Sequence, residues 1–142
     1  MATAQLIRDV MTAGPVCLRD SAYITEAAHR MREHGIGDVL IVDDQGRLEG
    51  VVTDRDIVVR GLAEGLDPTR ARLSEVVSTG CVTVRPDQSV DDAVDLMREH
   101  LLRRLPVVEA GQPVGVVSIG DLAVERAPDS ALADISSAPP NL

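Results

Sequence analysis

Two copies of one motif follow each other along this chain, and this duplication constrains its fold more than any other feature. When the sequence is shifted by 66 positions, the tetrapeptide that begins at Met31 lies over an identical tetrapeptide that begins at Met97. After a one-residue gap, residues 50–57 lie over the similar residues 115–122. Chance does not give an identical tetrapeptide and a similar octapeptide in the same register. The chain is therefore a tandem repeat of one structural unit.

Both copies show the same order of expected elements. A short apolar run indicates a first strand, at residues 16–18 and 82–84. Apolar residues spaced three and four apart then predict a helix in each copy: Ile24, Ala27, Ala28 and Met31, and Val90, Ala93, Val94 and Met97. Two apolar runs joined by a polar turn follow, at 39–42 and 48–53 and again at 105–108 and 114–118, before a second helix begins. The sequence predicts a mixed α/β (α+β) fold, two β-α-β-β-α repeats related by pseudo-two-fold symmetry, with the last two strands of each copy paired antiparallel.

Local signals place the boundaries of these repeats. The first repeat is expected at residues 1–63, a connector with an Asp-Pro turn at 64–71, and the second repeat at 72–126. Residues 127–142, rich in Ala, Ser and Pro, are expected to be a poorly ordered tail.

The ends of the first helix in each copy also carry signals. Ser89 with Asp92 predicts a capping box, whereas Tyr23 at the equivalent position cannot cap in that way. Gly35 is expected to end the first helix in a left-handed conformation.

Composition excludes several classes of function. The 142 residues contain 14 arginines, no lysine and 23 acidic residues, which gives a formal charge of −9. Without a lysine amine, P-loop and Schiff-base chemistry are excluded. The acidic charge and the absence of Trp and Phe argue against nucleic-acid binding. No apolar run is long enough to span a membrane and no signal peptide is evident, so we expect a cytoplasmic protein with no membrane partner.

Metal-binding and catalytic arrangements are also missing from the sequence. Cys17 and Cys81 form no zinc motif and are interpreted as small apolar residues, although a disulfide between them stays open. His29 and His34 are five residues apart, so they do not share a helix face as a metal pair would. No nucleophile stands in a recognisable order with a base. We therefore expect no metal and no enzymatic activity, and a small hydrolase is the least favoured alternative.

The repeated motif resembles a known family. Each copy ends in Gly-Val-Val-Thr/Ser-x-x-Asp-Ile/Leu, at residues 50–57 and 115–122, and begins with a lead segment, 9–12 or 75–78. Two such units in succession resemble a tandem pair of CBS domains, a Bateman module, and the likeness covers residues 5 to 126. Residues 53–58, 61–63 and 65–68 look most like the stand-alone actinobacterial pairs of the family. This likeness implies a regulatory role, with a stress response as its setting.

The Thr53/Asp56 and Ser118/Asp121 pairs carry two competing interpretations. A hydroxyl followed three residues later by an acid at a helix start is a capping box, which stabilises a helix by about 1 kcal/mol. The resemblance implies a second use of the same residues. It places Thr53 and Ser118 near the phosphate–ribose end of a nucleotide, and Asp56 and Asp121 on its ribose.

The two copies differ around these pairs. Arg55 lies inside the first motif and can meet a phosphate, whereas Gly120 takes its place in the second. The apolar-Pro pair that flanks adenine in family members occurs only in the second copy, at Leu105-Pro106, and Arg104 precedes it. We therefore expect phosphate number to matter more at Asp56, and adenine capture to be favoured beside Asp121. An exposed arginine pair at Arg103 and Arg104 can equally be a solvated surface.

Two hypotheses about function follow. The first is a sensor that binds AMP, ADP, ATP or another adenosyl ligand in the cleft between repeats and signals to an unknown effector protein. The second is a structural or protein-interaction module that binds no nucleotide. Leu96 and Leu102 widen the apolar stripe of the second copy's first helix, and this width predicts a homodimer.

Overall fold

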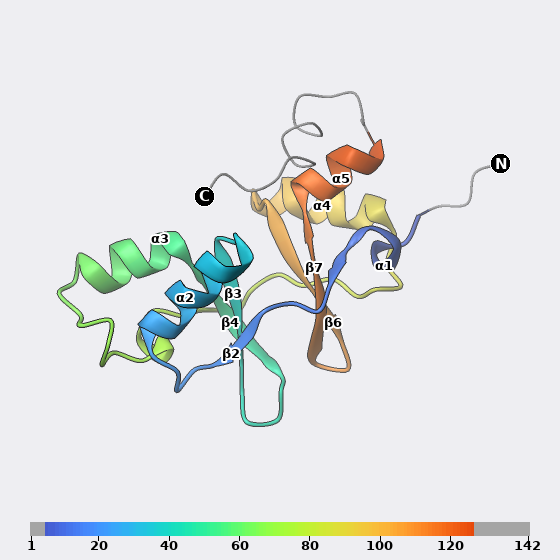
Figure 1. Cartoon of the computed structure of the whole chain (residues 1–142). Coiled ribbons are helices and arrows are strands. Elements are labelled where there is room, and N and C mark those ends of the chain that lie inside the picture. The colour runs from blue at the N-terminus through green and yellow to red at the C-terminus, as the bar shows by residue number, and fades with distance from the viewer. Residues whose placement is uncertain (1–4, 127–142) are drawn as a thin grey trace. The chain divides into compact units, whose positions relative to one another are not determined.

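The computed structural model describes residues 5–126, and their contacts form two compact units (Figure 1). One unit, called here the Thr53 unit, consists of residues 16–81. The other, called the Ser118 unit, combines residues 82–126 with residues 5–15 from the start of the chain. The tail expected at 127–142 lies outside the described residues. No helix among the described residues is long and apolar enough to cross a membrane.

The Thr53 unit is built on a four-stranded sheet in the order β2-β3-β4-β5. Its elements along the chain are β2 (Cys17–Arg19), α2 (Ile24–His34), β3 (Asp38–Val42), β4 (Leu48–Thr53), α3 (Asp54–Asp56), the π-helix η1 (Ile57–Leu62), the 3-10 helix η2 (Leu73–Glu75) and β5 (Ser78–Thr79). β2 runs parallel to β3, and the other neighbouring strands are antiparallel. Helix α2 packs on β3, and α3 and η1 continue directly from the end of β4.

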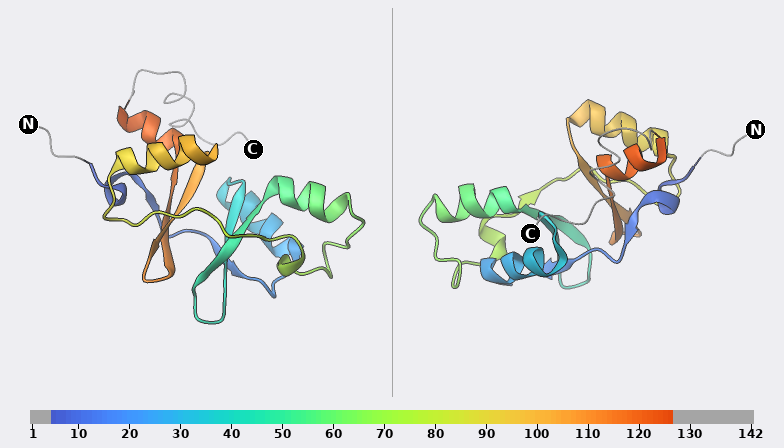
Figure 2. Two further views of the ribbon diagram at one scale, coloured as in Figure 1. Left: turned by 180° about the vertical axis from the view of Figure 1, so that it is seen from behind. Right: turned by 45° about the horizontal axis from the view of Figure 1, so that its top comes forward.

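The Ser118 unit repeats this plan with a three-stranded sheet in the order β1-β7-β6. Its elements are α1 (Ile7–Val10), β1 (Thr12–Ala13), α4 (Val90–His100), β6 (Arg104–Glu109), β7 (Gln112–Ser118) and α5 (Ile119–Arg126). Helices α4 and α5 contact each other on one side of the β6–β7 hairpin, as the views in Figures 1 and 2 show. The mixed α+β fold predicted from the sequence is confirmed. The β-α-β-β-α order is complete in the first repeat, whereas the second repeat lacks its first strand.

The predicted strand pairings are also confirmed. β3 pairs antiparallel with β4, and Asp38, the first residue of β3, lies opposite Thr53, the last residue of β4. β6 pairs antiparallel with β7 in the same way, with Arg104 opposite Ser118. Each hairpin therefore brings the start of one strand beside the point where the following helix begins.

Matching residues of the two repeats build the two cores. The buried pairs related by the repeat are Ile24 and Val90, Ala27 and Ala93, Met31 and Met97, Val39 and Leu105, Ile41 and Val107, and Val52 and Val117. Three of the four residues in each predicted helical stripe are therefore core residues. Ala28 of the first stripe is exposed, and Val94 of the second is half-buried.

Each core is completed by the lead segment of the other repeat. Ile7, from the start of the chain, is fully buried among the core residues of the Ser118 unit. Its counterpart Leu73 is fully buried in the core of the Thr53 unit. The backbone N–H of Ile7 donates to Gln88, and that of Leu73 donates to Ala22, at 2.9 and 2.8 Å. The sequence boundaries at 63 and 72 follow the repeats along the chain, whereas the compact units exchange these two short segments.

One strand expected from the sequence is nearly absent. Residues 82–84 contribute only an isolated parallel bridge, between Val84 and Val107, where the first repeat has the strand β2. In the first repeat the N–H of Leu40 donates to the carbonyl of Val16 at 3.0 Å. The counterpart of Leu40 is Pro106, which has no N–H to donate. The proline therefore removes one hydrogen bond of the ladder and shortens this strand.

The helix ends follow the sequence signals. At the start of α4 the hydroxyl of Ser89 accepts the N–H of Asp92 at 3.1 Å, and the Asp92 carboxylate accepts the N–H of Ser89 at 3.3 Å. Tyr23 provides no side-chain cap for α2; the carbonyl of Ala71, at the end of the connector, accepts the N–H of Ile24 instead. Gly35 ends α2 with φ 62°, the left-handed conformation expected for it.

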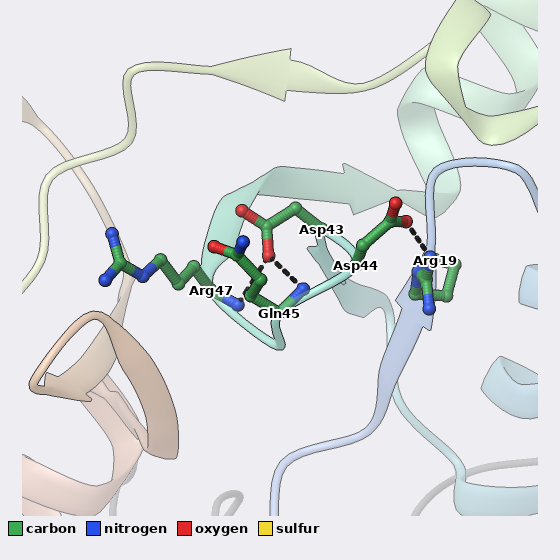
Figure 3. A network of polar contacts seen from close by, with 5 residues as sticks. All are labelled: Arg19, Asp43, Asp44, Gln45 and Arg47. Carbon is green, nitrogen blue, oxygen red and sulfur yellow. Dashed lines mark hydrogen bonds and ion pairs between the residues drawn. The ribbon is translucent and has the colours of Figure 1, made fainter.

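A carboxylate organises the turn that joins β3 to β4 (Figure 3). Asp43 Oδ1 accepts the backbone N–H of Gln45 at 2.8 Å and that of Arg47 at 2.9 Å. These two donors, that of Arg47 first, lower the pKa of Asp43 from its usual value. The neighbouring Asp44 forms an ion pair with Arg19 at the end of β2. The turn thus fixes where β4 begins, and hence the register that brings Asp38 opposite Thr53.

Gly50 and Gly115 allow the lead segments to approach the sheets closely. A Cβ added to Gly50 would lie 2.2 Å from the carbonyl oxygen of Ser78 on β5. One added to Gly115 would lie 2.8 Å from the carbonyl oxygen of Thr12 on β1 and 2.7 Å from the sulfur of Met11. All three distances are too short for a Cβ atom, and two of the three obstacles are backbone carbonyl oxygens. The glycine that opens the repeated Gly-Val-Val motif is therefore required by strand packing.

We predict that Gly50→Ala and Gly115→Ala each destabilise the protein. Overpacking of this kind costs about 1–3 kcal/mol, because the lead strand has to move away from its neighbour. Gly61→Ala is a matched control, since its Cβ would meet Ile24 at an ordinary 3.6 Å inside a helix. Thermal unfolding of the three variants is the measurement. A melting temperature for Gly50→Ala at or above that of Gly61→Ala would contradict the prediction.

Candidate adenosyl-ligand sites

In both units a hydroxyl and a carboxylate meet where the last strand becomes a helix. The Thr53 hydroxyl accepts the N–H of Asp56 at 3.0 Å, and Asp56 Oδ2 accepts the N–H of Thr53 at 2.9 Å. Ser118 and Asp121 make the same two hydrogen bonds, at 3.0 and 2.9 Å. All four side chains are half-buried. The capping boxes predicted from the sequence are therefore formed, and each holds its aspartate in a fixed position.

The backbone around these pairs is also the same in both units. The N–H of Asp54 donates to the carbonyl of Gly37 at 2.9 Å. In the other unit the N–H of Ile119 donates to the carbonyl of Arg103 at 2.8 Å. These bonds attach the first residue of the helix to the residue just before the neighbouring strand. The repeat therefore preserves one backbone frame, and only the side chains on it differ.

The opposing strand adds one charged side chain to each frame. Directly opposed residues of an antiparallel pair point to the same face, with Cβ atoms about 4.5–5.5 Å apart. Asp38 is opposed to Thr53, and Arg104 is opposed to Ser118. Asp38 is half-buried and Arg104 is exposed. Of the predicted site residues, the structure thus brings Arg104, Ser118 and Asp121 onto one frame.

The remaining predicted residues differ in how accessible they are. Arg55 is exposed and follows Thr53 by two residues, so it belongs to the Thr53 frame. Pro106 is buried on β6. Leu105 is fully buried within the core of the Ser118 unit. Its side chain therefore holds β6 in the core, and the adenine contact implied by the family resemblance stays a prediction.

Sequence reasoning missed Asp38, Asp54 and Ile119 as parts of these frames. The signal that could have found them is the repeat itself, because residues 38 and 104 occupy equivalent positions, as do 54 and 119. Asp54 Oδ1 accepts the N–H of Arg55 at 2.8 Å, and its Oδ2 lies 3.2 Å from the position of a Cβ on Gly37. The Asp54 carboxylate thus lies beside the start of β3.

The cysteines and potential metal ligands form no metal site in the described part of the chain. Neither Cys17 nor Cys81 forms a disulfide within the described residues. Burial raises the pKa of each thiol, which keeps it protonated and weakly nucleophilic at neutral pH. Among residues 5–126, no three His, Cys, Asp or Glu side chains gather to hold a metal ion.

Comparison with known proteins identifies the repeat. The model of the CBS domain matches the chain twice, at residues 7–62 and 73–127. The chain belongs to the CBS domain family. Its fold is a CBS-domain pair, and the two matches coincide with the two copies found by shifting the sequence.

Relatives match most of the CBS-domain pair. Hypoxic response protein 1 of Mycobacterium tuberculosis is 42% identical over 116 residues, which cover 82% of this chain and 81% of that protein. The CBS domain-containing protein YhcV of Bacillus subtilis is 41% identical over 134 residues, covering 92% of this chain and 94% of the relative. The likeness is therefore to proteins of about the same size.

Solved structures share the fold. A crystal structure of Hypoxic Response Protein I with two coordinated zinc ions has a TM-score of 0.77 at 41% identity, covering 84% of this chain and 97% of that one. The CBS domain pair of protein MJ0100, in complex with 5′-methylthioadenosine and S-adenosyl-L-methionine, has a TM-score of 0.79 at 26% identity. That match covers 90% of this chain and all of the other.

We predict that both capping hydroxyls contribute to stability. Thr53→Ala and Ser118→Ala should each cost about 0.5–2 kcal/mol, because a helix N–H loses its acceptor. Ser89→Ala, at a capping box of the same type on α4, provides the reference for a cap with no other role. Chemical denaturation of the three variants measures the cost. Wild-type stability of Thr53→Ala and Ser118→Ala would show that these bonds do not hold the helix starts.

Proposed function

We propose that this CBS-domain pair is a regulatory protein that binds an adenosine-containing ligand at the Thr53/Asp56 and Ser118/Asp121 frames. The observation that carries the proposal is the position of the two aspartates. Each carboxylate is fixed at a helix start by one oxygen, Oδ2, through the capping bond. Neither Asp56 Oδ1 nor Asp121 Oδ1 is used in that bond. A carboxylate oxygen held in this way suits the paired hydroxyls of a ribose, as in other nucleotide-binding folds.

The comparisons support the same class of ligand. The CBS pair of MJ0100 was solved with two adenosyl compounds and is 26% identical to this chain. Both compounds carry a sulfur at the 5′ carbon, and they share the adenine and the ribose with its 2′ and 3′ hydroxyls. Adenosine is therefore the part of the ligand that we carry over to this chain, with AMP, ADP and ATP included among the candidates.

A regulatory role fits the chemistry of the described residues better than a catalytic one. The capping side chains at the two frames are hydroxyls and carboxylates. Burial raises the pKa of both described cysteine thiols, which weakens them as nucleophiles at neutral pH. We propose that ligand binding alters how the pair engages an effector protein in the cytoplasm, in the setting of a stress response.

Ligand binding predicts a specific pattern of affinity losses. The double variant Asp56→Ala, Asp121→Ala should bind AMP and 5′-methylthioadenosine at least about tenfold more weakly than wild type. Hydrogen bonds to a charged group are worth about 1.5–3 kcal/mol each, and about 1.4 kcal/mol is tenfold in affinity. Asp92→Ala removes a capping carboxylate of the same type on α4, and should leave affinity unchanged. Isothermal titration calorimetry measures all three proteins.

Two results would contradict this function. If wild type binds neither compound, the chain is a structural or interaction module, and the caps are only caps. If the double variant binds as tightly as wild type, the ligand lies elsewhere. A thermal-shift series supports the titration, because ligand at 100 times its dissociation constant adds about 2.7 kcal/mol to stability.

We further propose that the protein is a homodimer joined through the helices of the Ser118 unit. An apolar groove of about 410 Å³ lies between α4 and α5, lined by Val94, Met97, Arg98, Leu102, Ile119, Leu122 and Ala123. Leu101, beside it, is 89% exposed. Of the two residues expected to widen the stripe, Leu102 lines the groove and Leu96 packs against the core. An exposed apolar surface of this kind marks an interface.

Dimer formation predicts a mass of two chains in light scattering at micromolar concentration. Leu102→Glu places a charge in the groove and should shift the mass toward one chain. Thr83→Glu, an exposed position of the same unit, is the matched control. A single-chain mass for wild type, or a dimer that survives Leu102→Glu unchanged, would refute an interface at this groove.

A further inference from the structure

The two candidate sites have the same backbone and opposite charge. Both begin with a capping box of nearly equal distances, and both attach the helix to the residue before the neighbouring strand. Six equivalent positions define each frame: residues 37, 38 and 53–56 in the Thr53 unit, and 103, 104 and 118–121 in the Ser118 unit. Differences between these two sets are differences in side chain alone.

The Thr53 frame is rich in carboxylates. Asp38 opposes Thr53 across the hairpin, and the Asp54 carboxylate lies beside Gly37 at the same end of the strand. Asp56 is fixed by the cap. Arg55 is the one cation of this frame, and it stands in sequence between two of the acids. The six positions of this frame therefore hold three carboxylates against one guanidinium.

The Ser118 frame is rich in guanidinium groups. Arg104 opposes Ser118, and Arg103 precedes it at the position of Gly37. Ile119 replaces Asp54, and the buried Gly120 replaces Arg55. Asp121 is the one carboxylate among these six residues. Two arginines are thus exposed at the start of β6, beside the helix start that holds the capping aspartate.

From this contrast we infer that the two sites take adenosyl ligands of different charge class. The Ser118 site selects ligands with a 5′ phosphate, because guanidinium groups pair with phosphate oxygens through charge-assisted hydrogen bonds. The Thr53 site selects adenosyl ligands whose 5′ group carries no negative charge, because its carboxylates repel a phosphate. This inference rests on the proposed function and assigns a ligand class to each of its two sites. It reverses the expectation, drawn from Arg55 alone, that phosphate number matters more beside Asp56.

The first test separates the sites with two probes that differ at the 5′ position, AMP and 5′-methylthioadenosine. Titrations use the full chain and the single variants Asp56→Ala and Asp121→Ala. We expect Asp121→Ala to weaken AMP binding at least about tenfold while the tighter 5′-methylthioadenosine site is retained. Asp56→Ala should weaken the binding of 5′-methylthioadenosine at least about tenfold while the tighter AMP site is retained. If AMP binding is lost in Asp56→Ala and kept in Asp121→Ala, the assignment is overturned and the proposed function stands.

The second test changes the charge and leaves the capping boxes intact. Arg104→Glu should weaken AMP binding by about tenfold or more, and binding of 5′-methylthioadenosine by less than about twofold. Asp38→Asn should strengthen AMP binding at the Thr53 site when measured in the Asp121→Ala background. Added salt should weaken AMP binding and leave 5′-methylthioadenosine unaffected, because only the former depends on net charge.

Each possible result of these titrations supports or overturns the charge assignment of the two sites. Equal losses of both probes in Arg104→Glu would show that Arg104 supports the frame and does not sense charge, which overturns the inference. Thermal unfolding of each variant excludes general loss of the fold as the cause. If wild type binds neither probe, the proposed function has failed and the charge assignment falls with it.

Discussion

The exchange of lead segments between the repeats is the contact on which the rest of the structure depends. The core of each unit includes a fully buried apolar residue from the other repeat: Ile7 in the Ser118 unit and Leu73 in the Thr53 unit. The strand that follows each of these residues lies against a glycine, Gly115 or Gly50, with no room for a Cβ. Since β4 and β7 are fixed by these contacts, so are the strand ends that hold the candidate sites.

The capping box links the stability of each helix start to the proposed binding of a ligand. The same hydrogen bond that satisfies the helix start at Thr53 also fixes the carboxylate of Asp56, and the arrangement is repeated at Ser118 and Asp121. A carboxylate that is already in place loses little conformational freedom when a ligand binds. A residue pair whose spacing predicts a helix cap is therefore also well suited to bind a ligand, because one geometry serves both roles.

Duplication left the backbone of the two frames nearly unchanged and the side chains free to diverge. The carbonyls of Gly37 and Arg103 accept the same hydrogen bond from the next helix, because a main-chain bond does not depend on the side chain. Asp38 and Arg104 oppose equivalent hydroxyls, yet one is an acid and the other a base. Charge reversal of this kind alters which ligands a site accepts with little effect on the core. A repeated frame can in this way carry two specificities in a small protein.

The sequence by itself determined the repeat, the main helix and the antiparallel hairpin of each copy, and the capping boxes. These depend on local periodicity and on hydrogen bonds within four residues, and both are visible in the order of residues. It did not determine which repeat the lead segments join, because Ile7 and Leu73 are equally apolar and nothing local distinguishes the two cores. Nor did it show that Leu105 belongs to the core, or that Pro106 shortens the strand at residues 82–84 by withholding an N–H. Only tertiary structure decided the residues that face each capping box, because strand register across a turn brings Asp38 to Thr53 and Arg104 to Ser118.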